Sequence, residues 1–183
     1  MPPTPSILLV SGSLRAGSTN TAALRSIVGT EGLRTALYEG TGSLPHFDPG
    51  HDRDPLPPPV VDLRAQLGAV DAVLFCTPEY AGTLPGSFKN LLDWAVGGGE
   101  LYEKPVGWIN VSAHGSGTGA TGTLGVVLGY CGCRIVEDAC AQVPVARSDV
   151  GDNGEVADPD LVARLRDVAV RLAAGTNAAP GGV

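Results

Sequence analysis

A loop with the composition of a phosphate-binding site follows the first apolar segment of the chain. It runs from Gly12 to Asn20 and reads GSLRAGSTN. A loop that leads into a helix presents free backbone N–H groups, and Arg15 adds a planar cation that suits phosphate. Short polar side chains beside this arginine are the other expected phosphate contacts, namely Ser13, Ser18, Thr19 and Asn20. The sequence therefore predicts a cradle that holds a phosphate group.

This loop differs from the nucleoside-triphosphatase P-loop at one decisive position. The pattern G-x-x-x-x-G-K-[ST] fits from Gly12 to Gly17, but Ser18 stands where the lysine belongs. Without that lysine, chemistry at a γ-phosphate loses its main cation, so we expect the phosphate to be held and not transferred. A structural alternative stays open, in which Ser18 or Thr19 merely caps a helix and Gly12 makes a tight turn.

Two further glycine-bearing loops follow later apolar segments. The first reads PEYAGTLPG from Pro78 and leads into GSFKNLLDWA. The second runs from Ser112 to Gly122 and contains a formal G-x-G-x-x-G, with Glu137 twenty residues beyond its first glycine. That spacing is also found in pyridine-dinucleotide Rossmann domains. We disfavour this alternative because the fingerprint normally occupies the first strand–helix unit, where this chain carries the phosphate loop.

Short apolar segments alternate with helix-like segments along the whole chain. The expected strands are 6–11, 33–39, 71–77, 105–112 and 133–137, and the expected helices are 18–31, 58–69, 85–96, 118–130 and 158–174. This alternation predicts an α/β fold, a doubly wound five-stranded parallel sheet in three α/β/α layers. In the strand order 2-1-3-4-5, strands one and three flank the point where ligands bind, so their loops can face one ligand. We expect a single domain over 1–183, with frayed tails at 1–5 and 176–183.

Composition and charge exclude several classes of function. The net charge is −7 and no basic stripe is visible, which argues against a nucleic-acid partner. No apolar run is long enough to span a membrane, and the first residues lack the basic region of a signal peptide, so we expect a cytoplasmic protein. Cys131 and Cys133 lack the spacing of a redox or zinc motif, Cys76 is expected in the core, and we expect no metal site.

The two long motifs together resemble one known family. The pair G-S-L-R-x-G-S-x-N and P-E-Y-x-G-[ST]-x-P-G-x-x-K-N-x-x-D-W is similar to the NADPH-dependent FMN reductase family, which has a flavodoxin-like fold. That family includes NAD(P)H-dependent quinone, chromate and azo-compound reductases. The resemblance covers most of residues 6–137.

The resemblance implies FMN as a cofactor, with its phosphate in the loop at 12–20. It implies that a second set of residues wraps the flavin ring, largely through the backbone: Pro78, Glu79, Tyr80, Ala81 and Gly82. The chain departs from the family at Ala81, where asparagine is common. By position, the third loop contributes Ser112, Gly115 and Gly119.

The expected function is that of an FMN-dependent NAD(P)H oxidoreductase. Hydride would pass from NAD(P)H to FMN and then to a quinone-like or other small acceptor, with no catalytic side chain required. Quinones, free flavin, chromate, azo compounds and iron chelates all stay open as acceptors. A non-enzymatic, flavodoxin-like electron carrier and a scaffold domain without flavin are the alternatives. The resemblance also implies a homodimer or homotetramer, and we expect Lys89 or Asp93 to pair across a subunit interface.

Overall fold

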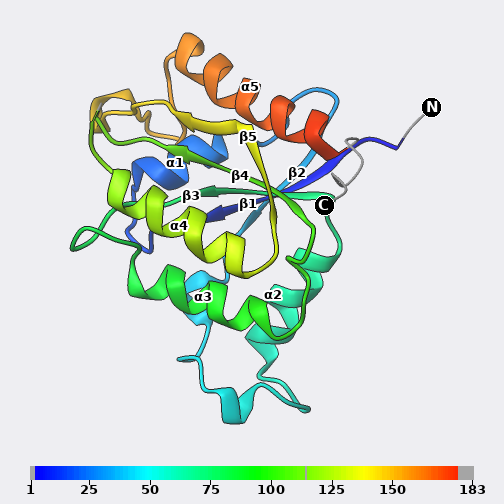
Figure 1. The fold of residues 1–183 in the computed structure, drawn as a ribbon. Coiled ribbons are helices and arrows are strands. Elements are labelled where there is room, and N and C mark those ends of the chain that lie inside the picture. Colours follow the sequence, from blue (N-terminus) through cyan, green and yellow to red (C-terminus); the bar gives the residue numbers. More distant parts are fainter. Residues whose placement is uncertain (1–2, 114, 177–183) are drawn as a thin grey trace.

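A five-stranded parallel sheet forms the centre of the computed structural model, which describes residues 3–113 and 115–176 (Figure 1). The strands lie in the order β2-β1-β3-β4-β5, and each neighbouring pair is parallel. Their bounds are Ser6–Ser11 for β1, Arg34–Tyr38 for β2, Ala72–Cys76 for β3, Pro105–Asn110 for β4 and Arg134–Gln142 for β5. The predicted fold class and strand order are therefore confirmed.

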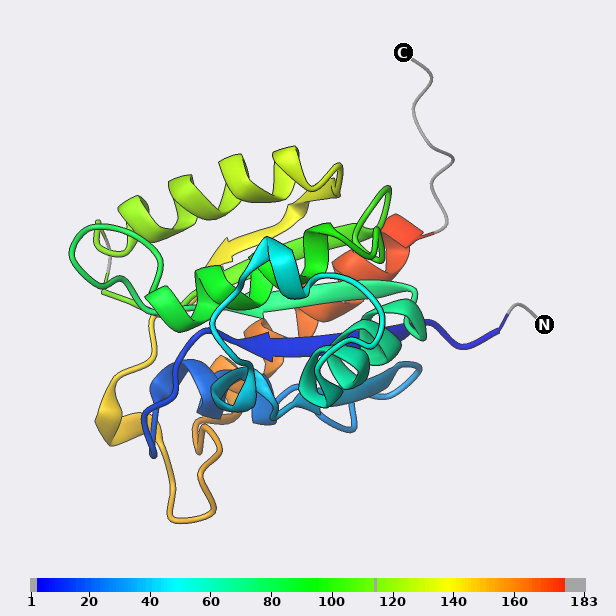
Figure 2. The ribbon, with the colours of Figure 1, turned by 90° about the horizontal axis from the view of Figure 1, so that it is seen from below.

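Helices cover both faces of this sheet. Within the described residues, α1 and α5 lie on one face and α2, α3 and α4 on the other (Figures 1 and 2). Their bounds are Thr19–Arg25 for α1, Pro58–Gly68 for α2, Gly86–Val96 for α3, Thr118–Tyr130 for α4 and Pro159–Thr176 for α5. In this part of the chain no helix has the length and apolar character needed to cross a bilayer.

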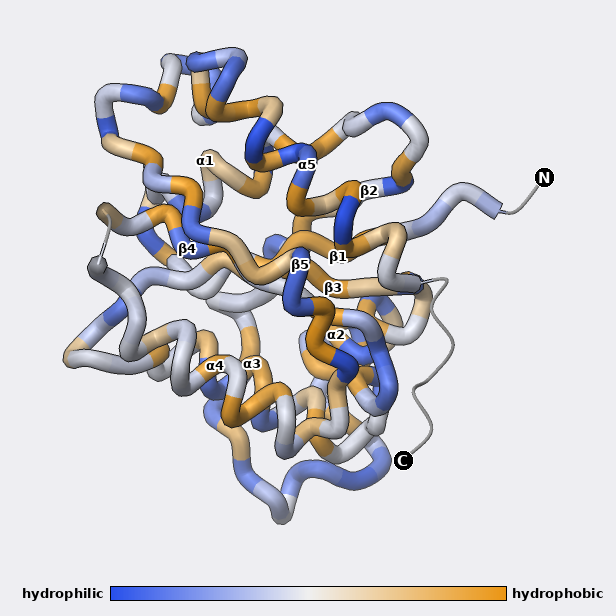
Figure 3. Tube along the Cα trace, turned by 45° about the horizontal axis from the view of Figure 1, so that its top comes forward, coloured by the Kyte–Doolittle hydropathy of each residue, from blue (hydrophilic) through white to orange (hydrophobic). Residues whose placement is uncertain are grey.

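Burial on both faces explains why the strands read as unbroken apolar runs. In β1, Ile7 and Leu9 pack against α1 and α5, whereas Leu8 and Val10 pack with residues of α2, α3 and α4. In Figure 3 the central strands β1 and β3 are largely hydrophobic, whereas many of the outer loops are hydrophilic. A shift of β1 by one residue would exchange its two buried faces, so the strand register is strongly specified.

The first helix is shorter than the predicted range of 18–31. It ends at Arg25, and the next N–H groups donate to carbonyls three residues back, from Ile27 to Leu24 and from Val28 to Arg25. The Ser26 hydroxyl donates to the carbonyl of Ala22 and accepts the N–H of Val156 at 2.8 Å. A loop more than a hundred residues away therefore fixes this helix end, which local sequence does not reveal.

The last strand is longer than the predicted range of 133–137. Val106 lies opposite Ile135, but Trp108 lies opposite Cys140, so β5 contains extra residues at a bulge and then continues pairing to Gln142. Bulges are common on edge strands, and this one extends β5 toward the site.

The ends of α5 differ less from prediction. Asp158 caps the helix, because its Oδ1 accepts the N–H of Asp160 at 2.9 Å. The helix continues past its predicted end at residue 174 to Thr176. Of the expected frayed tails, residues 1–2 and 177–183 lie outside the described residues.

A tight turn projects from the carboxyl end of β3. Tyr80 and Thr83 exchange two backbone hydrogen bonds, of 2.9 and 3.1 Å. The two residues between them are both left-handed, with φ of 51° at Ala81 and 76° at Gly82, as in a type I′ turn. Glycine adopts this conformation freely, whereas alanine is destabilised there by about 1 kcal/mol. Asparagine tolerates it better, which gives a backbone reason for the asparagine that is common here in the family that the motifs resemble.

Replacing Ala81 should therefore stabilise the fold. We expect Ala81→Gly and Ala81→Asn to raise the free energy of unfolding by about 1 kcal/mol, measured by thermal or urea denaturation. The matched control is Ala146→Gly, since Ala146 has an ordinary φ of −78°. That change should lower stability by about 0.5 kcal/mol through the unfolded state. Loss of stability in Ala81→Gly would contradict the assignment of backbone strain.

Candidate functional site

A cavity of about 530 Å³ lies at the carboxyl ends of the central strands. Its volume is in the range of small-molecule sites. Nine residues predicted as ligand contacts line it: Ser13, Arg15, Ser18, Thr19, Asn20, Pro78, Glu79, Tyr80 and Ser112. The structure therefore brings the three predicted loops together around one volume.

Four predicted contacts do not line this cavity: Ala81, Gly82, Gly115 and Gly119. Ala81 and Gly82 form the tip of the turn after β3. Gly119 faces this turn, because a Cβ at its position would overlap the carbonyl oxygen of Gly82. A glycine is therefore required where the turn after β3 meets the first turn of α4, and the contact of Gly119 with the ring stays a prediction. His114 of the third loop lies outside the described residues.

The phosphate-type loop is held by the strand before it and the helix after it. The N–H of Gly12 donates to the carbonyl of Cys76 at 2.9 Å, which extends the pairing of β1 with β3. The Ser11 hydroxyl accepts the N–H of Ser13 at 3.2 Å and lies 2.8 Å from the hydroxyl of Thr21. Ser18 takes the N-cap position of α1, but its side chain makes no capping hydrogen bond. Ser18 therefore provides no capping side chain here, and its role as a phosphate contact stays a prediction.

A buried thiol orients one of the expected phosphate contacts. Cys76 is fully buried, as predicted, and its Sγ donates to Oδ1 of Asn20 at 3.3 Å. Burial raises the pKa of this thiol well above its usual range, so the donor proton stays in place at neutral pH. The bond leaves the amide nitrogen of Asn20 available to a ligand in the cavity.

Two arginines give the cavity a positive character. Arg15 and Arg147 both line it, and neither makes an ion pair within the described residues. Sequence reasoning missed Arg147 because it lies beyond the three predicted loops. Arg147 follows β5 at the sheet edge where β1 and β3 also end, and this position could have indicated that it lies near the site.

Polar side chains of β4 and β5 hold the third loop in place. Asn110, which is buried, donates through Nδ2 to the carbonyl of Ser116 at 2.7 Å and accepts the N–H of Ser112 at 3.0 Å. Nε2 of Gln142 donates to the carbonyl of Ala113 at 3.0 Å. Loop residues that the sequence did not indicate also line the cavity, together with parts of the neighbouring segments: Val111, Ala113, Ser116, Gly117 and Val145.

The dinucleotide alternative is wrong for this loop. Its glycines begin α4, after the fourth strand, in a sheet with the order 2-1-3-4-5. The classical dinucleotide order is 3-2-1-4-5-6, with the fingerprint in the first unit. Glu137, which would contact the ribose in that interpretation, lies exposed on the edge strand β5.

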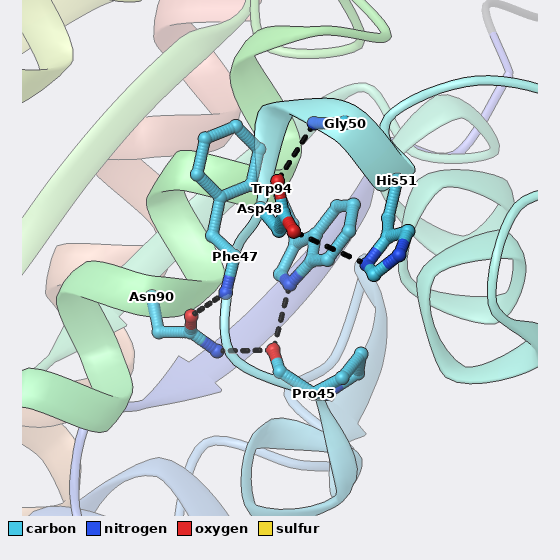
Figure 4. A network of polar contacts seen from close by, with 7 residues as sticks. All are labelled: Pro45, Phe47, Asp48, Gly50, His51, Asn90 and Trp94. Carbon is cyan, nitrogen blue, oxygen red and sulfur yellow. Dashed lines mark hydrogen bonds and ion pairs between the residues drawn. The ribbon is translucent and has the colours of Figure 1, made fainter.

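The remaining motif residues on α3 hold another loop and do not line the cavity. Asn90 accepts the N–H of Phe47 at 2.7 Å and donates to the carbonyl of Pro45 at 2.9 Å (Figure 4). Trp94 donates through Nε1 to the same carbonyl at 2.8 Å, and its ring meets Phe47 edge-on. These contacts fix the segment after β2 against α3, so Asn90 and Trp94 have structural roles.

Lys89 and Asp93 of the same helix pair with each other in this chain. The predicted cross-subunit pair therefore competes with an existing contact and stays a prediction.

Comparison with known proteins agrees with this geometry. The NADPH-dependent FMN reductase family matches residues 5–147. The NAD(P)H-dependent FMN reductase PA1204 of Pseudomonas aeruginosa is 38% identical over 116 residues, which are 61% of this chain and 62% of that protein. A probable NADPH:quinone oxidoreductase 2 of Oryza sativa subsp. japonica is 29% identical over 92% of this chain and 87% of its own length.

A solved structure shows the same arrangement of elements. FerB, a flavoenzyme NAD(P)H:(acceptor) oxidoreductase from Paracoccus denitrificans, superposes with a TM-score of 0.72 at 27% identity. The match covers 92% of this chain and 95% of that one. With the family match extending over most of the sequence, this chain belongs to the NADPH-dependent FMN reductase family.

Proposed function

We propose that this protein is an NAD(P)H-dependent FMN oxidoreductase that reduces a quinone-like or other small acceptor. The observation that carries the proposal is one cavity that joins the loop at 12–20 to the loops at 78–80 and 112–117. FMN is an elongated molecule with a phosphate at one end and a ring at the other. When bound, FMN accepts a hydride from NAD(P)H and passes the electrons to the second substrate.

The residues present suit FMN at both ends of the cavity. At one end, Arg15 has no carboxylate partner in the described part of the chain, and the Ser18 hydroxyl caps no backbone group. These groups can bind a phosphate dianion by charge-assisted hydrogen bonds. At the other end, Pro78, Tyr80 and the backbone of the third loop offer apolar surface and amide groups to a ring.

We propose no proton-transfer role for the side chains at the end of the cavity that would bind the flavin ring. Of the described residues lining the cavity, Glu79 is the one carboxylic acid, and its carboxylate is bonded to α4. The proposed contribution of the protein is therefore to bind and orient the cofactor. The phosphate contacts we propose are Ser13, Arg15, Ser18, Thr19, Asn20 and Arg147, and the ring contacts are Pro78, Tyr80, Ser112 and the backbone at Gly117.

Binding of FMN should depend on Arg15 through the phosphate. We expect Arg15→Ala to weaken FMN binding roughly 10- to 100-fold, the value of a hydrogen bond to a charged group. Riboflavin lacks the phosphate, so its affinity should not change. Fluorescence quenching of each flavin measures both constants, and Arg171→Ala on the exposed face of α5 is the control. Equal losses for FMN and riboflavin would place Arg15 away from the phosphate.

Turnover distinguishes the enzyme from an electron carrier. With FMN bound, purified protein should oxidise NADPH when a benzoquinone is added, with one NADPH and one proton consumed per quinone reduced. Because both substrates would use one pocket in turn, double-reciprocal plots at several quinone concentrations should be parallel. A yellow complex that NADPH cannot reduce would instead favour the carrier, and a chain that binds no FMN would favour the scaffold alternative.

We also propose a homodimer or homotetramer. Helix α4 carries no charged side chain, yet Val126 and Tyr130 are exposed on it, at 61% and 91%. Uncharged helix surface of this kind is typical of interfaces. Val126→Asp should shift the protein toward monomer in light scattering, whereas Val170→Asp on α5 should not. If light scattering gives the same oligomer mass for Val126→Asp as for wild type, α4 does not form the interface.

The cytoplasmic location remains a prediction as well. It is supported by the use of NAD(P)H, which cells keep inside, and by the four cysteines, which are all free.

A further inference from the structure

The carboxylate of Glu79 is bonded to a different segment of the chain, although Glu79 lines the cavity. Its Oε2 accepts the backbone N–H of Ala120 at 3.0 Å. Ala120 is the third residue of α4, which begins at Thr118. The loop after β3 therefore supplies a cap to the helix that follows β4.

Helix α4 lacks a cap of its own. The N-cap position is held by Gly117, with a φ of 76°, and no acidic residue lies in the first turn. A side chain cannot be accommodated there, because a Cβ at Gly117 would lie 2.6 Å from Oδ1 of Asn110. The first N–H groups of a helix have no partner within the helix. Glu79 supplies a hydrogen-bond acceptor for one of these N–H groups from outside the helix.

Two other contacts join the same two segments. The hydroxyls of Thr83 and Thr123 lie 3.0 Å apart. Gly119 lies so close to the carbonyl of Gly82 that no side chain fits between them. The turn at 80–83 and the first two turns of α4 therefore form one unit, and the ring end of the cavity lies beside it.

The same contact sets the charge at this end of the cavity. A helix N-terminus carries roughly +0.5 elementary charge, and a carboxylate beside it, with a full negative charge, more than offsets that charge. Without the carboxylate, the helix end would favour any anion bound nearby. Reduced FMN bears one more negative charge than oxidised FMN at neutral pH, so the two forms of the cofactor would respond differently to its loss.

We propose that Glu79 is a positioning residue with two effects, an inference that rests on the proposed function. Its hydrogen bond holds the turn at 80–83 against α4 and so maintains the conformation of the part of the cavity that would bind the flavin ring. Its charge offsets the positive end of α4 and so keeps reduced FMN from being bound more tightly. The first effect sets the affinity for FMN, and the second sets the reduction potential of the bound cofactor.

Two substitutions separate these effects. Glu79→Gln keeps an oxygen acceptor for the N–H of Ala120 but removes the charge. It should leave the affinity for oxidised FMN within about threefold of wild type, and should raise the affinity for reduced FMN about tenfold relative to oxidised FMN. For a two-electron couple, a tenfold change corresponds to a shift of about 30 mV, here toward more positive potential.

Glu79→Ala removes both the cap and the charge. It should weaken binding of oxidised FMN about tenfold and lower the melting temperature of the apoprotein, whereas Glu79→Gln should restore both values. The control is Glu39→Gln, because Glu39 follows β2 at the same sheet edge but is 77% exposed and lies beside Arg25. Neither its FMN affinity nor its potential should move.

FMN titration and a reference-dye measurement of the potential give the two readouts. A Glu79→Gln variant with wild-type potential would overturn the charge role, and a Glu79→Ala variant with wild-type affinity would overturn the clamp. Both results require that wild-type protein binds FMN. If the wild type does not bind it, the proposed function fails first, which is a different and recognisable outcome.

Discussion

The register between β1 and β3 is the interaction on which the site depends. Ser11 lies opposite Cys76, and the N–H of Gly12 donates to the carbonyl of Cys76 one step further along. Both strands end at this point, so the loop with Arg15 and the loop with Tyr80 diverge from the same edge. Both strands are also buried on two faces, and a one-residue slip would place every side chain on the wrong side. Core packing therefore determines the distance between the two halves of the cavity.

Buried polar side chains then hold the loops at this edge in defined conformations. Asn110 bonds to both ends of the third loop, Glu79 joins the second loop to α4, and the Cys76 thiol orients Asn20 in the first. The Glu79 and Cys76 bonds connect residues from different strand–helix units, whereas the Asn110 bonds close the loop within one unit. The loops are glycine-rich and have little packing of their own, so their shape depends on these few bonds, and each satisfies a group that would be costly to bury unpaired.

The sequence predicted those parts of the structure that local pattern controls. Strands β1 and β3 and helices α2 to α4 lie within one or two residues of their predicted bounds, because burial and helical spacing repeat along each segment. The range predicted for α1 is too long because Val156, far along the chain, fixes the end of this helix at Ser26. The range predicted for β5 is too short because a bulge interrupts the apolar pattern of this strand. The two family motifs and the position of the third loop located nine cavity residues, whereas Arg147 was missed because it lies beyond all three loops.

Glu79 illustrates why motif residues can be located before their roles are understood. Its place beside Tyr80 indicated a ligand contact, and the structure does put it at the cavity. The partner of its carboxylate lies 41 residues away and is a backbone N–H, which no side-chain pattern reveals. The need arises from Gly117, which cannot carry a capping side chain because Asn110 occupies the space. Because Asn110 must stay there to hold the third loop, the glycine at 117 and the acid at 79 follow from the same packing constraint.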